Sequence, residues 1–246
     1  MWARVFIFSL FLQAQASIIS LDLCADQWVL ELVPPRDIFA VTYLAQDPDI
    51  SFFSEKAIGL KVHKGEIEEL LDPAIKSAVA MDNLDPFIKN ILEKRGVRII
   101  VLKSPQTLEE VNEQRQFLIK ELGLKEKDSN PFPSPPLSRK RAVCYGASGL
   151  SPGGKTLLGQ ALTKAGFENG FKNFKGWKYI DWEKILEADP AVVFLLEGPS
   201  KNRHHPFWKR FMKNRREVEL PKKVTLCACY STVNELIETM KKTHHA

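Results

Sequence analysis

The chain has 246 residues and carries 35 Lys and Arg against 30 Asp and Glu, which gives a formal net charge of +5. Both signs are spread along the chain, a pattern typical of a solvated surface and not of a nucleic-acid-binding protein. No apolar run reaches the roughly 20 residues that a membrane-spanning helix needs.

The first sixteen residues are typical of a secretory signal peptide. They contain one cation, Arg4, then an apolar run over residues 5–12 that only Ser9 interrupts, and they end in Gln-Ala-Gln-Ala, the small-x-small pattern that precedes a cleavage site. The apolar run is too short to span a bilayer, and Ser17 in place of cysteine gives no reason to expect a lipid anchor. We expect residues 1–16 to be removed on export; the alternative is a buried N-terminal helix or strand.

Short strands alternate with helices over residues 17–122, the predicted first lobe. The strands are predicted at 18–21, 38–43, 59–63, 77–81 and 97–102, and the helices at 25–33, 66–71, 86–95 and 107–122. The first of these helices ends at Pro34-Pro35, which cannot continue it. Strands that alternate with helices predict a mostly parallel sheet covered on both faces.

A change in composition marks a boundary. Residues 131–136 contain four prolines, and we predict a linker over 123–140. The pattern then restarts in a second lobe over 141–246. Its strands are predicted at 141–145, 191–196 and 224–228, and its helices at 155–165, 182–187, 207–216 and 233–242. Two α/β lobes place a cleft between them, where ligands commonly bind.

Residues 149–156, Gly-Leu-Ser-Pro-Gly-Gly-Lys-Thr, match the phosphate-binding pattern G-x-x-x-x-G-K-[ST] between a predicted strand and a predicted helix. Three features weigh against a nucleotide. An exported protein meets no cytosolic ATP, and Pro152 removes a backbone N–H that a phosphate nest could use. Glu197 follows the next strand, where a Mg²⁺-holding Asp is usual. A P-loop nucleotide-binding enzyme is kept as an alternative, as is a loop that binds an anionic ligand through its N–H groups.

The four cysteines are Cys24, Cys144, Cys227 and Cys229. An even number in an exported protein permits disulfides. If residues 224–228 form a strand, Cys227 and Cys229 face the same side of it. Neither has a zinc-site partner at the right spacing, so structural or incidental thiols are expected. An approach of Cys24 to Cys144 across the cleft is left open.

Five segments follow one another in a recognisable order. They are 19–32, with Ser-Leu-Asp-Leu-Cys-Ala-Asp; 38–48, a strand and loop ending in Asp-Pro; 62–70, with Val-His-Lys-Gly-Glu; 145–166, with its glycine loop; and 181–194, which ends in Pro-Ala-Val-Val-Phe. In this order and spacing they resemble the helical-backbone class of periplasmic substrate-binding proteins. These are components of ABC importers for cobalamin, ferric siderophores and haem.

The resemblance implies two lobes, each a mostly parallel sheet flanked by helices, with the ligand in the cleft where loops at the carboxyl ends of the strands face each other. The candidate ligand-binding residues are Asp22, Cys24, Asp26, Trp28, Tyr43, His63, Asp82 and Asn83 in the first lobe and Tyr145, Ser148, Ser151, Trp177, Tyr179 and Glu197 in the second. Aromatic side chains there would offer flat contact area to a macrocycle or a catecholate. Three candidates have structural alternatives: Asp26 as the cap of a helix over 27–32, Trp28 as core, and Cys24 as a small buried group.

The resemblance also implies a partner, the permease of an ABC importer in the inner membrane, which family members meet through one carboxylate on each lobe. The candidates are Glu66 or Glu68 on the first lobe and Glu183 or Glu187 on the second. Acidic residues in a first helical turn also stabilise the helix dipole, which is the alternative for each. The expected protein is a periplasmic monomer that captures an iron chelate or a corrinoid-type ligand and delivers it, without catalysis, resident cofactor or resident metal ion.

One departure from the family concerns the connection between the lobes. The family uses a long helix, whereas here only the proline-rich segment 123–140 separates Leu122 from the second lobe. Either the helix over 107–122 serves as the connection, or the bridge is shortened and the lobes move more freely. A further function stays open, that of a haem or metal carrier with His63 or Tyr43 as axial ligand.

Overall fold

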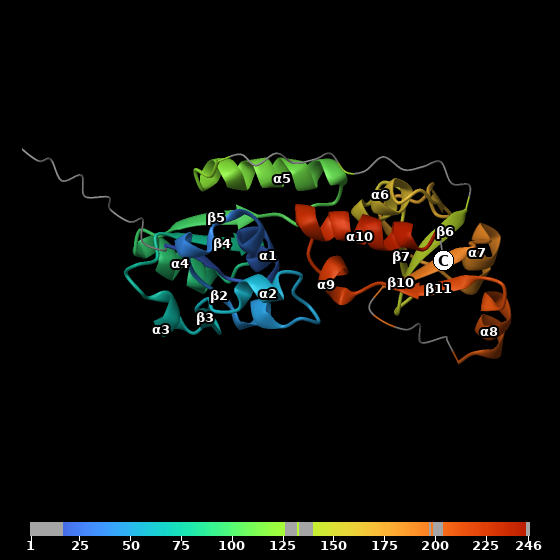
Figure 1. Cartoon of the computed structure of the whole chain (residues 1–246), viewed down its shortest axis with the longest axis horizontal. Coiled ribbons are helices and arrows are strands. Elements are labelled where there is room, and N and C mark those ends of the chain that lie inside the picture. The colour runs from blue at the N-terminus through green and yellow to red at the C-terminus, as the bar shows by residue number, and fades with distance from the viewer. Residues whose placement is uncertain (1–16, 126–131, 133–139, 197, 199–203, 245–246) are drawn as a thin grey trace, which may run out of the picture.

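The computed structural model describes residues 17–125, 132, 140–196, 198 and 204–244. These residues form two α/β lobes that lie side by side (Figure 1), which confirms the predicted fold class. The proposed signal peptide, most of the predicted linker and Glu197 lie outside the described residues, so the domain boundaries stay predictions. Among the described residues, no helix combines the length and the apolar composition needed to cross a membrane.

The first lobe is built on a five-stranded sheet in the order β3-β2-β1-β4-β5, with every neighbouring pair parallel. Its strands are β1 (Ile18–Ser20), β2 (Ile38–Thr42), β3 (Val62–His63), β4 (Ser77–Met81) and β5 (Arg98–Leu102). Its helices are α1 (Leu23–Leu32), α2 (Ser54–Ala57), α3 (Ile67–Leu70), α4 (Pro86–Lys94) and α5 (Leu108–Glu121), with 3-10 turns at Pro35–Asp37 and Tyr43–Gln46. The central strands are buried along most of their length, as expected of a parallel sheet between helices.

The start of α1 is tied to the sheet by one side chain. Asp22 is the N-cap residue, and its Oδ1 accepts a hydrogen bond from the N–H of Ala25 at 2.9 Å. Its Oδ2 accepts from the N–H of Met81, the last residue of β4, at 2.7 Å. An aspartate at this position satisfies a helix N–H that has no partner inside the helix, and here it also joins two elements. The alternative for Asp26, a cap of this helix, is therefore wrong, because the cap is Asp22.

The second lobe contains a four-stranded parallel sheet in the order β11-β10-β6-β8 and a separate antiparallel pair, β7 with β9. The strands are β6 (Arg141–Gly146), β7 (Leu150–Pro152), β8 (Glu168–Asn169), β9 (Trp177–Tyr179), β10 (Val192–Leu196) and β11 (Arg216–Glu219). The helices are α6 (Leu157–Lys164), α7 (Trp182–Ala188), α8 (Pro206–Met212), α9 (Lys222–Thr225) and α10 (Tyr230–Lys242).

Two predictions for the second lobe were wrong. The strand predicted at 224–228 is instead the end of α9 followed by a loop, because Pro221 begins a helical turn and Cys227 is held by a long-range disulfide. The helix predicted at 207–216 ends at Met212, and the last strand of the sheet follows it as β11. Its sequence, Arg-Glu-Val-Glu, has one apolar residue, so a search for apolar runs overlooks this edge strand.

The lobes are joined through α5 and α10. The C-terminal end of α5 stays on the first lobe, where Arg98 of β5 pairs with Glu121 at 3.8 Å. At its other end, the N–H of Leu108 donates to Oε1 of Gln160 in α6 at 2.7 Å. A continuous cluster of buried apolar side chains runs from the first-lobe sheet through α5 and α10 into the second lobe. Thus α5 lies along one lobe instead of spanning both, and the lobes meet at a packed junction.

Candidate ligand-binding cleft

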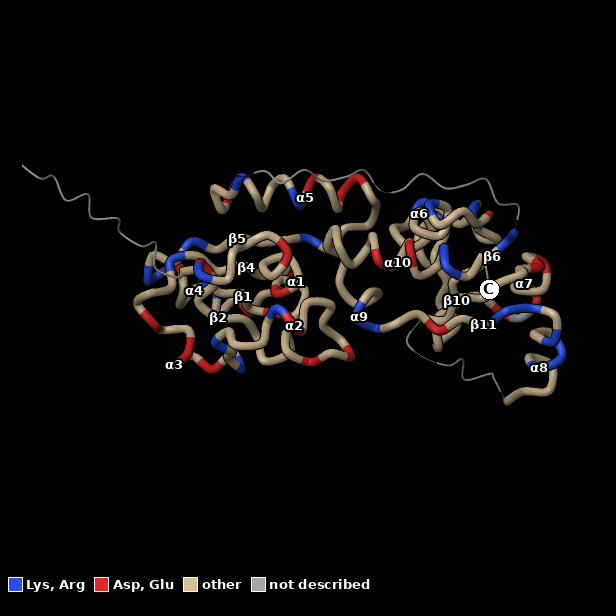
Figure 2. Tube along the Cα trace, in the orientation of Figure 1, with Lys and Arg blue, Asp and Glu red and all other residues tan. Residues whose placement is uncertain are grey.

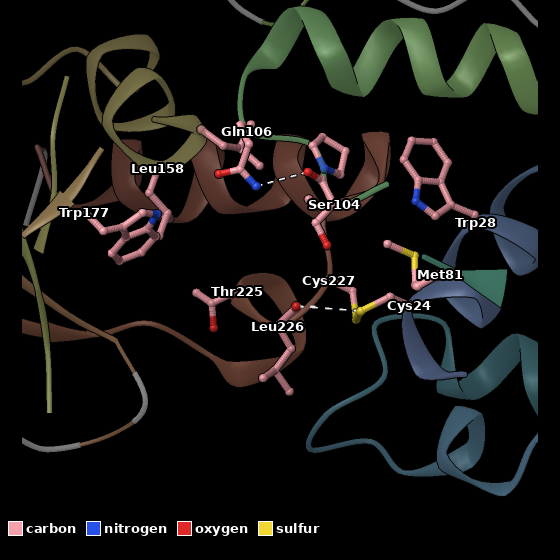
Figure 3. A pocket seen from close by; sticks show the side chains of 13 residues that line it. Cys24, Trp28, Met81, Ser104, Gln106, Leu158, Trp177, Thr225, Leu226 and Cys227 are labelled. Atoms are coloured by element: carbon pink, nitrogen blue, oxygen red, sulfur yellow. Dashed lines mark hydrogen bonds between the residues drawn. A yellow bond between two sulfur atoms is a disulfide. The ribbon is translucent and has the colours of Figure 1, made fainter. Parts of the chain in front are cut away.

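A pocket of about 170 Å³ lies where the two lobes meet (Figure 3). First-lobe residues and the segment after β5 form one side, and α6, β9 and the corner between α9 and α10 form the other. The lining is mainly apolar and includes two tryptophans and three sulfur-containing residues. The lining residues are Cys24, Trp28, Met81, Ser104, Pro105, Gln106, Leu157, Leu158, Trp177, Thr225, Leu226, Cys227 and Ala228.

One face of α1 forms the first-lobe side of this junction. Cys24, Trp28 and Glu31 are spaced i, i+4 and i+7, which places them on one side of a helix. Trp28 borders the pocket but is only 1% exposed and packs in the apolar core, which agrees with its structural alternative. Oε1 of Glu31 accepts hydrogen bonds from the N–H of Ser231 at 2.9 Å and from its hydroxyl at 2.7 Å, so this face also contacts the start of α10.

Cys24 forms a disulfide with Cys227, with the two Cα atoms 5.0 Å apart and a sequence separation of 203. The bond crosses from α1 of the first lobe to the α9–α10 corner of the second (Figure 3). Cys144 and Cys229 are buried free thiols. Burial raises the pKa of Cys144 to about 12, so this thiol stays protonated. The pairing left open for Cys24 is therefore with Cys227 and not with Cys144.

Exposed aromatic side chains lie at or near the ends of strands in both lobes. Trp177 and Tyr179 are alternate residues of β9, so they lie on one face of that strand. Trp177 is 41% exposed and lines the junction pocket, whereas Tyr179 is 78% exposed and does not. Tyr43, at the end of β2 in the first lobe, is 52% exposed. Such rings supply contact area to a flat ligand at a small entropic cost.

Asp26 is fully buried and lines neither the junction pocket nor the hollow that Asp22 and His63 line. Its carboxylate accepts hydrogen bonds from the hydroxyl of Ser20, from the N–H of Thr42 at 3.0 Å and from the hydroxyl of Thr42 at 2.5 Å. Burial raises its pKa from the ordinary 3.8 to about 7, and the hydrogen bonds oppose part of that shift. The side chain joins α1 to the carboxyl ends of β1 and β2, beneath the surface that a ligand reaches.

His63 is also buried, and both ring nitrogens are engaged by the backbone. Nε2 lies 2.7 Å from the carbonyl oxygen of Ser20, to which it donates, and Nδ1 accepts from the N–H of Gly65 at 3.1 Å. This pair of bonds selects one neutral tautomer. Burial lowers the pKa of the ring, which also favours the neutral form. A histidine held in this way has no nitrogen free to serve as an axial ligand to haem.

The remaining first-lobe candidates lie in two other hollows. Asp22, His63 and Asn83 line a pocket of about 230 Å³ at the carboxyl edge of the first sheet. Asp82 lines a groove of about 700 Å³ between β5 and α5. Neither hollow includes a residue of the second lobe.

The other second-lobe candidates do not line the junction pocket. Tyr145 is buried in the second-lobe core, where its ring stacks on Trp208 with the centroids 6.0 Å apart. Ser151 is fully buried in β7, and Ser148 is exposed in the turn before it. Of the thirteen candidates that lie within the described residues, the structure brings together Cys24, Trp28 and Trp177 around the pocket.

The glycine-rich segment 149–156 does not form a phosphate loop. Its first half is β7, and the N–H of Gly153 donates to the carbonyl oxygen of Gly176 at 2.8 Å. A Cβ on Gly153 would lie 2.1 Å from the carbonyl oxygen of Phe174, so this glycine allows close backbone packing. The hydroxyl of Thr156 donates to the carbonyl of Gly153 at 2.8 Å and accepts from the N–H of Gly159 at 3.1 Å. The N–H of Gly153 and the hydroxyl of Thr156, which a phosphate loop would direct at its ligand, are thus engaged within the protein.

Several pocket residues were missed by sequence reasoning. Met81 is the last residue of β4 and the segment 104–106 follows β5, so the rule that carboxyl strand ends face the cleft could have found them. Leu226 and Ala228 carried no such signal, because the segment around them reads as a strand. Among the described residues, no group of three or more His, Cys, Asp and Glu side chains is arranged to hold a metal ion.

No protein-family model matches the sequence, and no curated protein matches it significantly. The fold is nevertheless similar to solved structures. The periplasmic heme-binding protein HutB of Vibrio cholerae is 15% identical, with a TM-score of 0.66 over 94% of this chain and 99% of that chain. A possible iron-binding, periplasmic solute-binding protein from Staphylococcus epidermidis is 17% identical, with a TM-score of 0.65 over 94% and 98%.

A periplasmic heme-binding protein from Pseudomonas aeruginosa is 16% identical, with a TM-score of 0.61 over 93% of this chain and 92% of that chain. All three likenesses extend over nearly the whole length of both partners, so they include both lobes and the junction between them. The chain therefore has the two-lobed α/β fold of the periplasmic solute-binding proteins.

Proposed function

We propose that the protein is a periplasmic solute-binding protein that captures an iron chelate, a haem or a corrinoid between its lobes and delivers it to the permease of an ABC importer. The observation that carries the proposal is the junction pocket, which lies between two α/β lobes and has tryptophans on both sides (Figure 3). Mainly apolar pockets with a few polar groups are typical of small-molecule sites. The fold similarity to heme- and iron-binding proteins supports the same ligand class.

The size of the pocket suggests how a large ligand would lie. Pockets for drug-sized ligands usually enclose about 300–1,000 Å³, more than the 170 Å³ between the lobes here. A macrocyclic ligand would therefore fill the pocket with one edge and extend past Trp177 along β9, where the exposed ring of Tyr179 is available for stacking. For haem, Tyr43 is the remaining axial candidate, because the nitrogens of His63 are engaged.

Delivery would use carboxylates on both lobes. Glu66 and Glu68 lie at α3 and Glu183 and Glu187 on α7, at opposite ends of the molecule (Figure 2). Glu66 is the N-cap residue of α3, and Glu187 pairs with Lys184 at 3.0 Å. Within the described part of the chain, Glu68 and Glu183 are exposed and have no ion pair. They are thus the carboxylates best placed to meet permease arginines.

The test is a fluorescence titration of the mature chain, residues 17–246, with haemin, a ferric catecholate, cyanocobalamin and Mg-ATP. We expect saturable quenching by one chelate and no response to Mg-ATP, because Trp28 and Trp177 line the pocket. Trp177→Ala should weaken binding by about tenfold, the loss of roughly 1.4 kcal/mol of stacking. Phe87→Ala removes an aromatic ring that is 59% exposed on α4, away from the pocket, and should bind normally.

Two results would contradict the proposal. One is a saturable Mg-ATP response with no response to any chelate. The other is chelate binding that Trp177→Ala and Phe87→Ala reduce equally, since the ligand would then lie outside the junction. If haemin is the ligand, Tyr43→Phe should change its Soret band, which tests the axial role of the phenol.

A further inference from the structure

The Cys24–Cys227 disulfide is the covalent connection that the described residues make across the pocket. It lies in the wall of the pocket, because both cysteines belong to the lining. A bond that merely strengthened the fold could join any two surface segments. This one joins the two lobes at the position where a ligand would be held.

Both ends of the disulfide are anchored to the body of their lobes. On the first lobe, Cys24 lies in the first turn of α1, which Asp22 ties to Met81 at the end of β4. On the second lobe, the hydroxyl of Thr232 donates to the carbonyl oxygen of Cys227 at 2.7 Å, which ties the corner to α10. A bond between two anchored elements sets the separation of the lobes at the pocket.

The noncovalent contacts beside the disulfide combine one polar pair with apolar packing. Glu31 binds Ser231 through Oε1, but its Oε2 is buried without a hydrogen-bond partner in the described structure. A buried carboxylate oxygen without a partner reduces the net gain from such a contact. The corner itself contains α9, a four-residue helix with Val224 as its buried residue. Val224 and Cys229 of the corner also belong to the apolar cluster that contains Trp28 of α1, so the disulfide is the covalent part of a packed contact.

The two cysteines differ in exposure, since Cys24 is half-buried and Cys227 is only 5% exposed, and both line the pocket. A reductant that enters the pocket therefore meets the more exposed residue, Cys24, first. A ligand that fills the pocket covers the same residue. The ligand and the reductant therefore exclude each other from the pocket.

We propose that Cys24–Cys227 is a redox-sensitive latch of the ligand site. When oxidised, the bond keeps the lobes at the separation that binds the ligand, and when a dithiol reduces it, that separation is no longer fixed. This rests on the solute-binding function proposed above. Preorganisation raises affinity because the binding energy is not spent on ordering the site. By linkage, a ligand that prefers the oxidised state must also oppose reduction to the same degree.

The chemistry is a two-electron thiol–disulfide exchange. A thiolate of the reductant attacks the Cys24 sulfur, the bond between the cysteine sulfurs breaks, and Cys227 leaves as a thiolate that takes up a proton. The second thiol of the reductant then attacks its own sulfur in the mixed disulfide and releases Cys24. The reductant ends as a disulfide, and the protein has gained two electrons and two protons. A helix N-terminus favours a thiolate, and the position of Cys24 in the first turn of α1 helps its release.

The experiment begins with reduction of the mature chain by graded dithiothreitol, alkylation and peptide mass spectrometry. Cys24 and Cys227 should become labelled together. Cys144 and Cys229 should stay unlabelled in the folded chain, because burial raises both pKa values. Saturating haemin or ferric catecholate, whichever binds, should raise about tenfold the ratio of reduced to oxidised dithiothreitol at which half of the disulfide is reduced at equilibrium. Reduction should weaken binding of that probe by a similar factor, because the two effects are linked.

Two variants provide controls. Cys24→Ala with Cys227→Ala should bind the probe as weakly as the reduced protein and should not respond to dithiothreitol. Cys144→Ala, which changes a buried thiol in β6, should keep the full redox response. Circular dichroism checks that each variant is folded, and the reduced wild-type chain provides the same comparison without a mutation.

The redox proposal is wrong if the oxidised and the reduced protein bind the probe with equal affinity. That result would leave the solute-binding function intact. If neither state binds a chelate, the proposed function fails, and hydrogen exchange then decides on the latch. Faster exchange at α1 and the α9–α10 corner on reduction would support it, and unchanged exchange would refute it.

Discussion

Replacing Asp26 by Asn tests how a buried carboxyl affects stability. Burial raises the pKa of Asp26 from 3.8 to about 7, so the folded protein binds this proton more tightly than the unfolded chain does. Each pKa unit corresponds to about 1.4 kcal/mol, and the full shift corresponds to about 4 kcal/mol. The contribution of this bound proton to the unfolding free energy is fully present below pH 3.8, where both the folded and the unfolded states are protonated. It is lost as the pH rises to about 7.

The assay is urea unfolding, followed by circular dichroism, between about pH 5 and about pH 8. Over this interval the carboxyl should cost the wild-type protein roughly 2.5 kcal/mol of unfolding free energy. Asp26→Asn does not titrate and keeps an acceptor for the N–H of Thr42. Its stability relative to wild type should therefore rise by that amount as the pH increases.

Asp49→Asn is the matched control, because Asp49 is exposed and should follow the wild type at every pH. Other carboxylates also change stability with pH, but they cancel in the difference between variant and wild type. A difference between Asp26→Asn and wild type that stays constant across the interval would show that the carboxyl does not titrate there. The reasoning from burial would then be refuted.

Three further predictions follow from the junction and the glycine loop. Reduction, or Cys24→Ala with Cys227→Ala, should lower the unfolding free energy by at most about 5 kcal/mol, since the bond closes a loop of 203 residues; an unchanged urea midpoint would contradict this. Gly153→Ala should destabilise the protein by about 1–3 kcal/mol in thermal unfolding, because its Cβ would clash with the carbonyl of Phe174. Lys155→Ala should leave thermal unfolding and chelate binding in the fluorescence titration unchanged, because this side chain is exposed and the segment around it does not form a phosphate loop.

The strands and helices of the first lobe could be predicted because their signals are local. A parallel strand buried on both faces reads as a short apolar run, as in Ser77–Met81, and Pro34 marks the end of the helix before it. The rule that ligands meet the carboxyl ends of strands also found Cys24, Trp28 and Trp177 at the junction. These inferences depend on residues close together in the sequence.

Whether a side chain of a strand points into the core or into the cleft could not be predicted from residues close together in the sequence. Tyr145 and Trp177 are both aromatic and both belong to second-lobe strands, yet Tyr145 enters the core beside Trp208 while Trp177 faces the cleft. Successive residues of a strand point to opposite faces, so a shift of one residue reverses the outcome. Packing against distant elements decides it.

The fold class, two α/β lobes with a cleft, could be predicted from the amino-acid pattern alone, because alternating apolar runs and helix ends require few distant contacts. The chemistry of the cleft depends on contacts that form only when distant segments meet. Four cysteines permit three full pairings, and the one bond formed depends on the meeting of Cys24 and Cys227 from two lobes. His63 likewise became a structural residue because backbone groups engage both its nitrogens.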